Sequence, residues 1–400
     1  MSIELTKKQL EGLDIAVQRY NEGHRWTCIA GYAGTGKSTL IKFIISALGV
    51  NPDTDVCYVA FTGKAATVLK QKGCPNTMTA HKLLYKAKPM PNGTYKFIPK
   101  TVLEHPYKVI VVDEVSMLPK PMWELLTSHG AYILATGDPG QLPPIDKDSD
   151  NHVLDNAHVF LDEVMRQAQD SEIIRLSMWI REGKPLDQFP CKNEQVQIIT
   201  KGQVVTGMYE WADQILCSTN AKREEINKYV RQLKGYGALP QVGDKVISLR
   251  NHWQYLSEST NWALTNGSIG QIERFDLQEA WLPRSIKTGG PITYMYTDIR
   301  LEDGDAFFNT PIDYQALVTG TPALDSMQAY RLSKAKWTGK VPPFDFTYAY
   351  GMTVHKSQGS EWPKVLVFEE NFPFSKDEHI RSLYTAATRA EEKLVVVTKD

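Results

Sequence analysis

The chain has 400 residues, enough for two or three domains of about 100–200 residues each. Its 42% hydrophobic and 23% charged residues are ordinary for a globular protein and exclude a disordered chain or a coiled-coil fibre. No apolar run approaches the roughly 18 residues of a membrane helix, and the five cysteines contain no CxxC pair, so neither a zinc ribbon nor a disulfide framework is favoured. These features indicate a soluble protein of a reducing compartment with no membrane contact.

The charge is unevenly distributed, although the net charge is only −1. Residues 1–100 carry 14 basic and 6 acidic side chains, a net +8, against −9 for the remaining 300 residues. Residues 56–100 contain eight lysines and no acid, and aromatic side chains are interleaved with them: Tyr58, Phe61, Tyr85, Tyr95 and Phe97. Lysines that attract phosphate and rings that stack on bases are expected of a channel for single-stranded nucleic acid. A solvated basic face with core aromatics explains the pattern equally well.

Short apolar strands alternate with helices in the first part of the chain. The expected elements are strands at 26–30, 56–60, 107–112 and 131–135, and helices at 37–48 and 64–72. Such alternation is typical of a parallel sheet with crossover helices, so the predicted fold class is α/β. The same style returns at 214–233 and at 347–398, which predicts a second α/β domain.

Two segments interrupt this alternation. Residues 86–105 begin with lysine, proline and aromatic residues on either side of Asn92-Gly93, the strongest two-residue signal for a β-hairpin. From about 245 to 340 the helical periodicity disappears, and short β-like runs are separated by Gly, Pro and Asp clusters. We therefore expect an inserted hairpin in the first domain and a small antiparallel barrel inserted in the second.

The stretch Gly31-Tyr-Ala-Gly34-Thr35-Gly36-Lys37-Ser38 matches G-x-x-x-x-G-K-[ST], and it follows an expected strand and opens an expected helix. This context is that of a P-loop, in which backbone N–H groups and the helix N-terminus bind phosphates. Lys37 is expected to reach the β- and γ-phosphates, and the Ser38 hydroxyl to ligate Mg²⁺.

A pair of carboxylates, Asp113 and Glu114, follows the apolar strand that ends at Val112. In a P-loop enzyme the first acid holds Mg²⁺ and the second can activate the attacking water. The charge that develops on the γ-phosphate also needs a cation, and an arginine finger contributes roughly 10³–10⁵ in rate. Arg166 and Arg389 are the candidates.

Taken in order from Gln9 to Arg389, these stretches resemble the motifs of superfamily 1 helicases. The resemblance is to the RecD/Dda-type branch that moves 5′→3′ on DNA, and to its compact phage Dda-like members. It rests on the P-loop, on Gly137-Asp-Pro-Gly-Gln141-Leu-Pro143-Pro144, on Thr353-Val-His355-Lys356-Ser-Gln-Gly-Ser-Glu361, and on Tyr384-Thr-Ala-Ala-Thr-Arg389-Ala390.

The resemblance implies an ATP site with Mg²⁺. It assigns adenine recognition to Gln9, γ-phosphate sensing to Gln141, the arginine finger to Arg389, a second phosphate contact to Arg166, and a sugar contact to Glu361. The remaining nucleotide-binding residues are those of the loop and its helix start: Gly31, Gly34, Thr35, Gly36, Lys37, Ser38 and Thr39. Catalysis is assigned to Lys37, Asp113, Glu114, Gln141 and the two arginines, with Ser38 and Asp113 as the Mg²⁺ ligands.

The same resemblance implies contacts to single-stranded DNA. They are carried by Phe61, Thr62, Gly63, Lys64, Thr79, His81, Pro143, Asn220, Thr353, His355 and Lys356, and by Phe97 in the hairpin as a strand-separating wedge. Phe61 departs from the family pattern, in which proline is common. The threonines also fit ordinary caps at strand ends, the histidines also fit buried structural residues, and Phe97 also fits a plain hairpin aromatic.

The implied architecture has two RecA-like domains, residues 1–180 and residues 181–244 with 341–400, and a small Src-homology-3-like barrel at 245–340. The implied function is an ATP-dependent DNA helicase that acts as a monomer on single strands and junctions with duplex. Replication or recombination proteins are the implied partners, in the cytoplasm of a bacterium or a phage-infected host. A translocase without unwinding activity, a motor subunit of a recombination complex and an RNA helicase remain open. The motifs Thr353–Glu361 and Tyr384–Ala390 argue against a P-loop kinase or switch GTPase.

Overall fold

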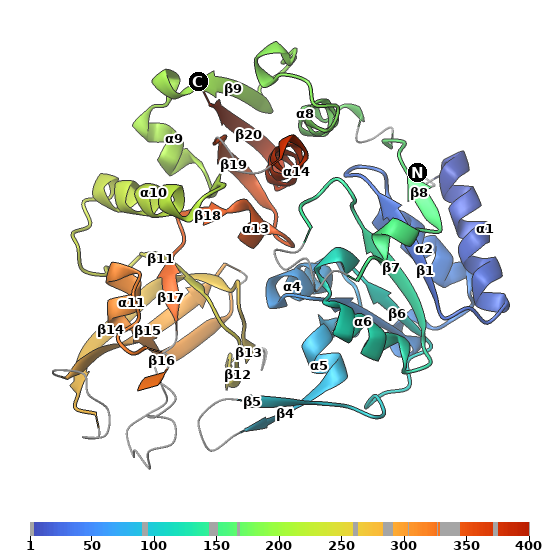
Figure 1. Cartoon of the computed structure of the whole chain (residues 1–400), viewed down its shortest axis with the longest axis horizontal. Coiled ribbons are helices and arrows are strands. Elements are labelled where there is room, and N and C mark those ends of the chain that lie inside the picture. Colours follow the sequence, from blue (N-terminus) through green and yellow to red (C-terminus); the bar gives the residue numbers. More distant parts are fainter. Residues whose placement is uncertain are drawn as a thin grey trace. The chain divides into compact units, whose positions relative to one another are not determined.

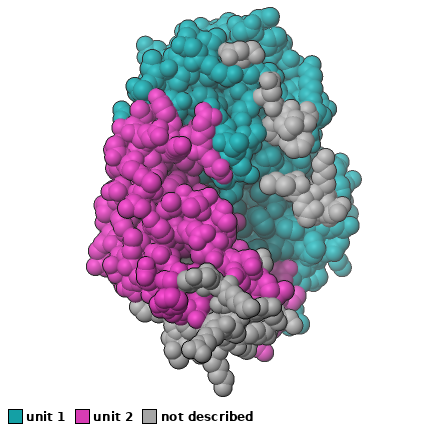
Figure 2. Space-filling model, turned by 60° about the vertical axis from the view of Figure 1, so that its left-hand side comes forward, with its two compact units in different colours: residues 1–84, 100–223, 352–400 teal, residues 85–99, 224–351 magenta. Residues whose placement is uncertain are grey.

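Figure 1 presents a computed structural model of the chain, which describes residues 4–89, 95–143, 151–165, 169–258, 263–282, 291–302, 304–325, 327–328, 345–370 and 375–399. The chain forms two compact units, coloured separately in Figure 2. Unit 1 contains residues 1–84, 100–223 and 352–400, and unit 2 contains residues 85–99 and 224–351. In the described part of the chain, no helix is long and apolar enough to span a membrane.

Unit 1 contains a six-stranded parallel sheet with the order β3-β2-β6-β7-β1-β8. Its strands are β1 (Trp26–Gly31), β2 (Val56–Ala60), β3 (Met78–Thr79), β6 (Val109–Val112), β7 (Tyr132–Gly137) and β8 (Val159–Leu161). The helices of this half are α1 (Lys7–Asn21), α2 (Lys37–Ala47), α3 (Pro52–Asp55), α4 (Gly63–Gln71), α5 (Ala80–Leu84) and α6 (Lys120–Thr127). We call this the first half of unit 1.

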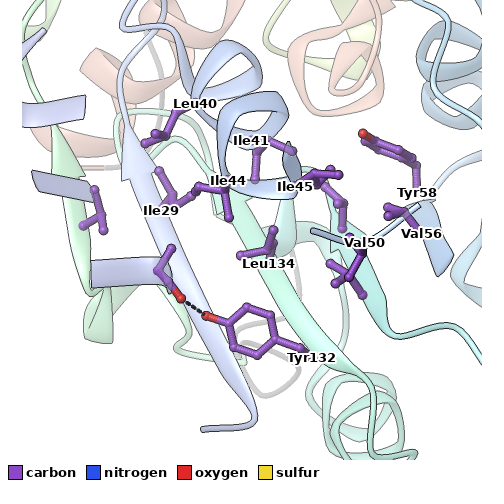
Figure 3. Close-up of a cluster of buried hydrophobic side chains, with 14 of the residues drawn as sticks. Ile29, Leu40, Ile41, Ile44, Ile45, Val50, Val56, Tyr58, Tyr132 and Leu134 are labelled. Carbon is purple, nitrogen blue, oxygen red and sulfur yellow. Dashed lines mark hydrogen bonds between the residues drawn. The ribbon is translucent and has the colours of Figure 1, made fainter. Parts of the chain in front are cut away.

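The core of the first half forms where α2 packs on the sheet. Ile29, Leu40, Ile44 and Leu134 are fully buried there (Figure 3). Near-continuous apolar strands such as β6 are expected of a parallel sheet that is covered on both faces. The hydroxyl of Tyr132 donates to the carbonyl oxygen of Ala16 at 2.9 Å, which satisfies a polar group inside this core.

Unit 1 also contains the second half, built on a sheet with the order β18-β10-β19-β20-β9. Its strands are β9 (Val196–Thr200), β10 (Gln214–Cys217), β18 (Gly351–Thr353), β19 (Trp362–Phe368) and β20 (Ala390–Thr398). Its helices are α8 (Glu172–Arg181), α9 (Thr206–Trp211), α10 (Asn220–Leu233), α13 (Val354–Ser357) and α14 (Lys376–Ala387), with α10 running on into unit 2. Short 3₁₀ turns lie at Val115–Met117, Leu154–Asn156, Leu186–Gln188 and Lys201–Gln203.

Unit 2 is built on an antiparallel sheet with the order β16-β15-β14-β11-β17. Its strands are β11 (Lys245–Ser248), β14 (Ile269–Ala280), β15 (Ile292–Leu301), β16 (Ala306–Asp313) and β17 (Phe346–Tyr348), with α11 (Tyr314–Thr319) and the small pair β12 (His252–Leu256) and β13 (Ala263–Leu264). Strand β17 lies within the segment 341–400 that the sequence assigned to the second α/β domain. It pairs instead with β11, with Tyr348 opposite Val246, so the five-stranded sheet of unit 1 resumes only at β18.

Strands β4 (Tyr85–Pro89) and β5 (Tyr95–Pro99) form a separate antiparallel pair in unit 2, with Phe97 opposite Ala87. The expected turn at Asn92-Gly93 lies outside the described residues. Residues 100–105, which the sequence included with the hairpin, belong to unit 1.

Candidate functional site

The loop between β1 and α2 has the backbone geometry of a phosphate cradle. Gly34 and Gly36 have φ angles of 74° and 78°, a region that favours glycine. A Cβ atom on Gly36 would lie only 2.5 Å from Nε2 of Gln9, so the loop also needs glycine for close packing. Lys37 Nζ donates to the carbonyl oxygens of Gly31 and Tyr32 at 2.7 and 2.9 Å. Burial lowers the pKa of Lys37.

Gln9 braces this loop from α1. Its Oε1 accepts the N–H of Thr6 at 2.9 Å, which completes a capping box, and its Nε2 donates to the carbonyl oxygen of Thr35 at 3.1 Å. The side chain is 1% exposed and also contacts the sulfur of Met165 at 3.2 Å. The contact to adenine that the sequence assigned to Gln9 stays a prediction.

The two carboxylates lie at the carboxyl end of β6. Asp113 Oδ1 accepts the Thr136 hydroxyl at 2.9 Å, which ties the first acid to β7. Glu114 has a φ of 48°, and a residue other than glycine in this left-handed region costs about 1–3 kcal/mol of backbone strain. Burial raises the pKa of Glu114 to about 7, while nearby Arg389 acts in the opposite direction. Strain and a perturbed carboxyl in one residue are typical of a functional site.

Arg389 comes from the second half and approaches these acids. Its Nη1 lies 3.8 Å from Oε1 of Glu114. The side chain is 4% exposed, and it donates to the carbonyl oxygens of Thr385 and Ser360 at 3.1 and 3.2 Å and to the Thr388 hydroxyl at 3.2 Å. A buried guanidinium bonded in this way is fixed in position.

A cavity beside the acids is lined by both halves of unit 1. Its walls include Asp113, Glu114, Gln358, Glu361, Arg389 and Lys72. The carboxylate of Glu361 pairs with Lys72 Nζ at 3.0 Å, a contact that the sequence does not indicate. Gln141 and Thr39 are half-buried and Ser38 is exposed. Arg166 lies outside the described residues.

Most candidate DNA-binding residues of the first half gather at one edge of its sheet. The stretch from Phe61 to Lys64 follows β2. Thr79 ends the neighbouring strand β3, and His81 follows it. The rings of Phe61 and His81 lie 5.9 Å apart. The hydroxyls of Thr62 and Thr79 each accept a backbone N–H at 3.2 Å, so both also serve as local caps. Lys64 Nζ lies 4.3 Å from the centre of the Trp362 ring.

The candidates of the second half gather in the same way at the neighbouring strands β18 and β10. Thr353 ends β18, His355 and Lys356 follow in α13, and Asn220 begins α10. Burial lowers the pKa of both His355 and Lys356, and Arg223 lowers the pKa of Lys356 further.

The two remaining candidates lie elsewhere. Pro143 is half-buried after β7, and Phe97 lies in unit 2, where its ring meets that of Tyr85 edge-on at 6.2 Å.

The two halves of unit 1 are joined by side-chain contacts that the sequence does not predict. Gln358 Nε2 donates to the Leu142 carbonyl at 2.8 Å, and the Leu142 N–H donates to the Thr385 hydroxyl at 2.9 Å. Tyr384 donates to Asp138 at 2.7 Å. All four polar residues stand inside motif stretches, but no local pattern indicates which of them meet.

Two family models match the chain. An AAA domain model matches residues 4–206, just over half of the chain, and a UvrD-like helicase C-terminal domain model matches residues 348–397. The chain belongs to the RecD/Dda-type superfamily 1 helicases. The predicted family is therefore confirmed, and its members use a nucleotide.

Curated relatives of this helicase-family chain include the ATP-dependent RecD2 DNA helicase of Deinococcus radiodurans, 27% identical over 93% of this chain and 46% of the relative. The ATP-dependent DNA helicase Dda of Enterobacteria phage T4 is 32% identical over 36% of this chain and 34% of the relative. Each match thus covers less than half of the relative's own length.

Solved structures of Pif1 helicases share the fold of this helicase-family chain. Bacteroides Pif1 bound to single-stranded DNA has a TM-score of 0.55 at 18% identity, covering 99% of this chain and 93% of that one. A Pif1 structure at forked double-stranded DNA has a TM-score of 0.52, also at 18% identity, covering 99% and 92%. These likenesses support the α/β, RecA-like part of the predicted fold class.

Proposed function

We propose that this chain is an ATP-dependent DNA helicase that moves 5′→3′ on single-stranded DNA and unwinds duplex. The observation that carries the proposal is Arg389, which reaches from the second half to 3.8 Å from Glu114 beside the P-loop of the first half. A cation that crosses between the halves stabilises the charge on a transferring phosphoryl group only when the halves are closed. Binding and hydrolysis of ATP can therefore bias closure, because only the closed state gives the phosphates this contact.

The residues present fit a nucleotide with its metal ion. Gly34 and Gly36 have the positive φ angles that a phosphate-binding loop needs, and the ammonium of Lys37 supplies its positive charge. Ser38 and Asp113 supply oxygen ligands of the kind that Mg²⁺ prefers. Bound there, Mg²⁺ would neutralise charge on the phosphates. Glu114 is the proposed base for the attacking water and Gln141 the proposed sensor of the γ-phosphate. Glu361 would exchange its bond with Lys72 for the nucleotide sugar.

The proposed DNA path uses the two clusters at the sheet edges. Phe61 to Lys64, Thr79 and His81 form one grip, and Asn220, Thr353, His355 and Lys356 form the other. Each cluster follows neighbouring strands of its own half, which supports two separate grips on one strand of DNA. Alternation of the grips during closure and opening would convert ATP hydrolysis into steps in one direction.

Unit 2 supplies the proposed strand-separating parts. The antiparallel pair β4/β5 is the proposed wedge, with Phe97 at the duplex junction, and the sheet of β11 and β14–β17 is the proposed Src-homology-3-like barrel. The protein is proposed to act as a monomer on single strands and junctions, and to work with replication or recombination proteins. We propose the cytoplasm of a bacterium or a phage-infected host as its compartment.

The test is translocation itself. A biotinylated oligonucleotide carries streptavidin at its 3′ or its 5′ end, and ATP-dependent displacement is followed with DNA and with RNA of the same sequence. The proposal expects displacement from the 3′ end of DNA, and none by Lys37→Ala. Displacement on RNA alone would favour an RNA motor, and ATP hydrolysis that DNA does not stimulate would contradict the proposal.

A further inference from the structure

The hydroxyl of Tyr384 stands between two segments of the ATP site. It accepts the backbone N–H of Ala33, inside the P-loop, at 2.9 Å, and it donates to Oδ2 of Asp138 at 2.7 Å. Tyr384 lies in α14 of the second half, whereas its two partners lie after β1 and β7 of the first half. One side chain thus joins the loop, the Asp138 turn and α14.

The ring of Tyr384 is packed as closely as its hydroxyl is bonded. The residue is 1% exposed, and its ring meets the Tyr32 ring edge-on at 6.5 Å. A Cβ atom on Gly140 would lie 3.0 Å from the Tyr384 ring, so the Asp138–Gly140 turn is in contact with it. Burial raises the pKa of Tyr384, so its hydroxyl keeps the proton and can donate a hydrogen bond.

Tyr384 lies five residues before Arg389, the proposed arginine finger, and α14 ends between them at Ala387. Thr385 adds a second connection, because its hydroxyl accepts the Leu142 N–H at 2.9 Å while its carbonyl oxygen accepts Nε of Arg389 at 3.1 Å. Hydrogen bonds at Tyr384 and Thr385 therefore fix the segment 384–389 to the first half. Within the segment, Thr385 and Thr388 accept hydrogen bonds from the Arg389 guanidinium. Any movement of this segment must displace Arg389 relative to Glu114.

We propose that Tyr384 is a positioning residue, which sets the place of the Arg389 guanidinium by joining α14 to Ala33 and Asp138. The proposal rests on the proposed function of the site as an ATPase. Misplacement of a catalytic group by about 1 Å can cost on the order of 10²-fold in rate, so a single lost hydroxyl can have a large effect without contact to the reacting atoms. Binding of the nucleotide ground state depends mainly on the P-loop and is expected to change little.

The test compares Tyr384→Phe with Tyr132→Phe. Both changes remove a buried hydroxyl with two hydrogen-bond partners, but Tyr132 bonds to Ala16 and Thr27 in the core of the first half. The measurements are kcat and KM of DNA-stimulated ATP hydrolysis, and the affinities for ADP and for ADP–aluminium fluoride, a transition-state mimic. Thermal unfolding of both variants reports any loss of folding. Thr385→Val, which removes the second connection, is a further variant should Tyr384→Phe unfold.

Tyr384→Phe is expected to lower kcat by about tenfold or more, with KM and ADP affinity nearly unchanged and weaker binding of ADP–aluminium fluoride. Tyr132→Phe is expected to keep the parent's kinetics. In an Arg389→Ala background, Tyr384→Phe is expected to add no further loss, because it acts through the missing guanidinium. Two results would overturn the positioning role alone. One is a Tyr384→Phe variant whose kcat equals that of Tyr132→Phe, and the other is a Tyr384→Phe change that lowers kcat in the Arg389→Ala background as much as it does in the parent. A parent without DNA-stimulated hydrolysis would overturn the proposed function as well.

Discussion

Arg389 and Glu114 face each other across the two halves of unit 1, with 3.8 Å between guanidinium and carboxylate. The arginine is almost fully buried and the carboxylate is one-quarter exposed. Each of the two has a distinct role in the proposed chemistry, since Glu114 would activate water and Arg389 would stabilise the phosphates. Their proximity allows the two roles to be tested by separate substitutions.

Glu114→Gln is expected to lower kcat of DNA-stimulated ATP hydrolysis by about 10²–10⁴-fold, the usual contribution of a general base. ATP binding should be retained, because the amide keeps the size of the side chain. Glu124→Gln, on the exposed face of α6, is the matched control and should behave as the parent. Steady-state kinetics and fluorescent-nucleotide titration check this, and rapid turnover by Glu114→Gln would remove Glu114 from the mechanism.

Arg389→Ala is expected to reduce kcat by roughly 10³–10⁵-fold, with a smaller loss of nucleotide affinity. Arg389→Lys should not restore activity, because an ammonium cannot reproduce the planar fork of donors. Arg381→Ala changes an exposed arginine of α14, the helix that precedes Arg389, and should have little effect. The same kinetic measurements apply, and near-parental turnover by Arg389→Lys would show that a point charge is sufficient.

Phe97→Ala is expected to slow duplex unwinding per ATP while ATP hydrolysis stimulated by single-stranded DNA is retained. The reason is that a wedge acts only at the duplex junction, whereas the ATP site lies in unit 1. Ile98→Ala is the control, since successive side chains of a strand point to opposite faces. Unwinding and ATPase assays carried out side by side check the prediction. Unchanged unwinding by Phe97→Ala would show that residues other than Phe97 separate the strands.

Asp244→Ala is expected to destabilise unit 2 by about 3–5 kcal/mol, because it leaves the buried Arg231 guanidinium without its carboxylate partner. The Asp244 carboxylate accepts bonds from Arg231 at 2.9 and 3.1 Å, from the Gln241 N–H at 2.8 Å and from the Tyr350 hydroxyl at 3.0 Å. Asp276→Ala changes an exposed carboxylate on β14 and should cost less than about 0.5 kcal/mol. Chemical denaturation of each variant measures the difference, and equal losses would contradict the role of this buried pair.

The sequence predicts the P-loop well because eight consecutive residues carry its geometry, including the glycines at 34 and 36. It predicts alternating strands and helices for the same reason, since periodicity is local. It does not indicate that Tyr384 meets Ala33 or that Lys72 meets Glu361, because these pairs are far apart in the chain and depend on how the halves pack. The sequence places β17 in the second α/β domain because a run of only three residues, Phe-Thr-Tyr, fits a parallel or an antiparallel sheet equally well, whereas the structure pairs it with β11.

Strand displacement on two tailed duplexes tests the proposed helicase activity most directly. The duplexes have the same sequence and differ only in whether the single-stranded tail is at the 5′ or the 3′ end. With ATP and Mg²⁺, the protein is expected to separate the 5′-tailed duplex and to leave the 3′-tailed duplex paired, while Lys37→Ala separates neither. Separation of the 3′-tailed duplex alone, or of neither duplex by a protein that hydrolyses ATP on DNA, would contradict a 5′→3′ helicase.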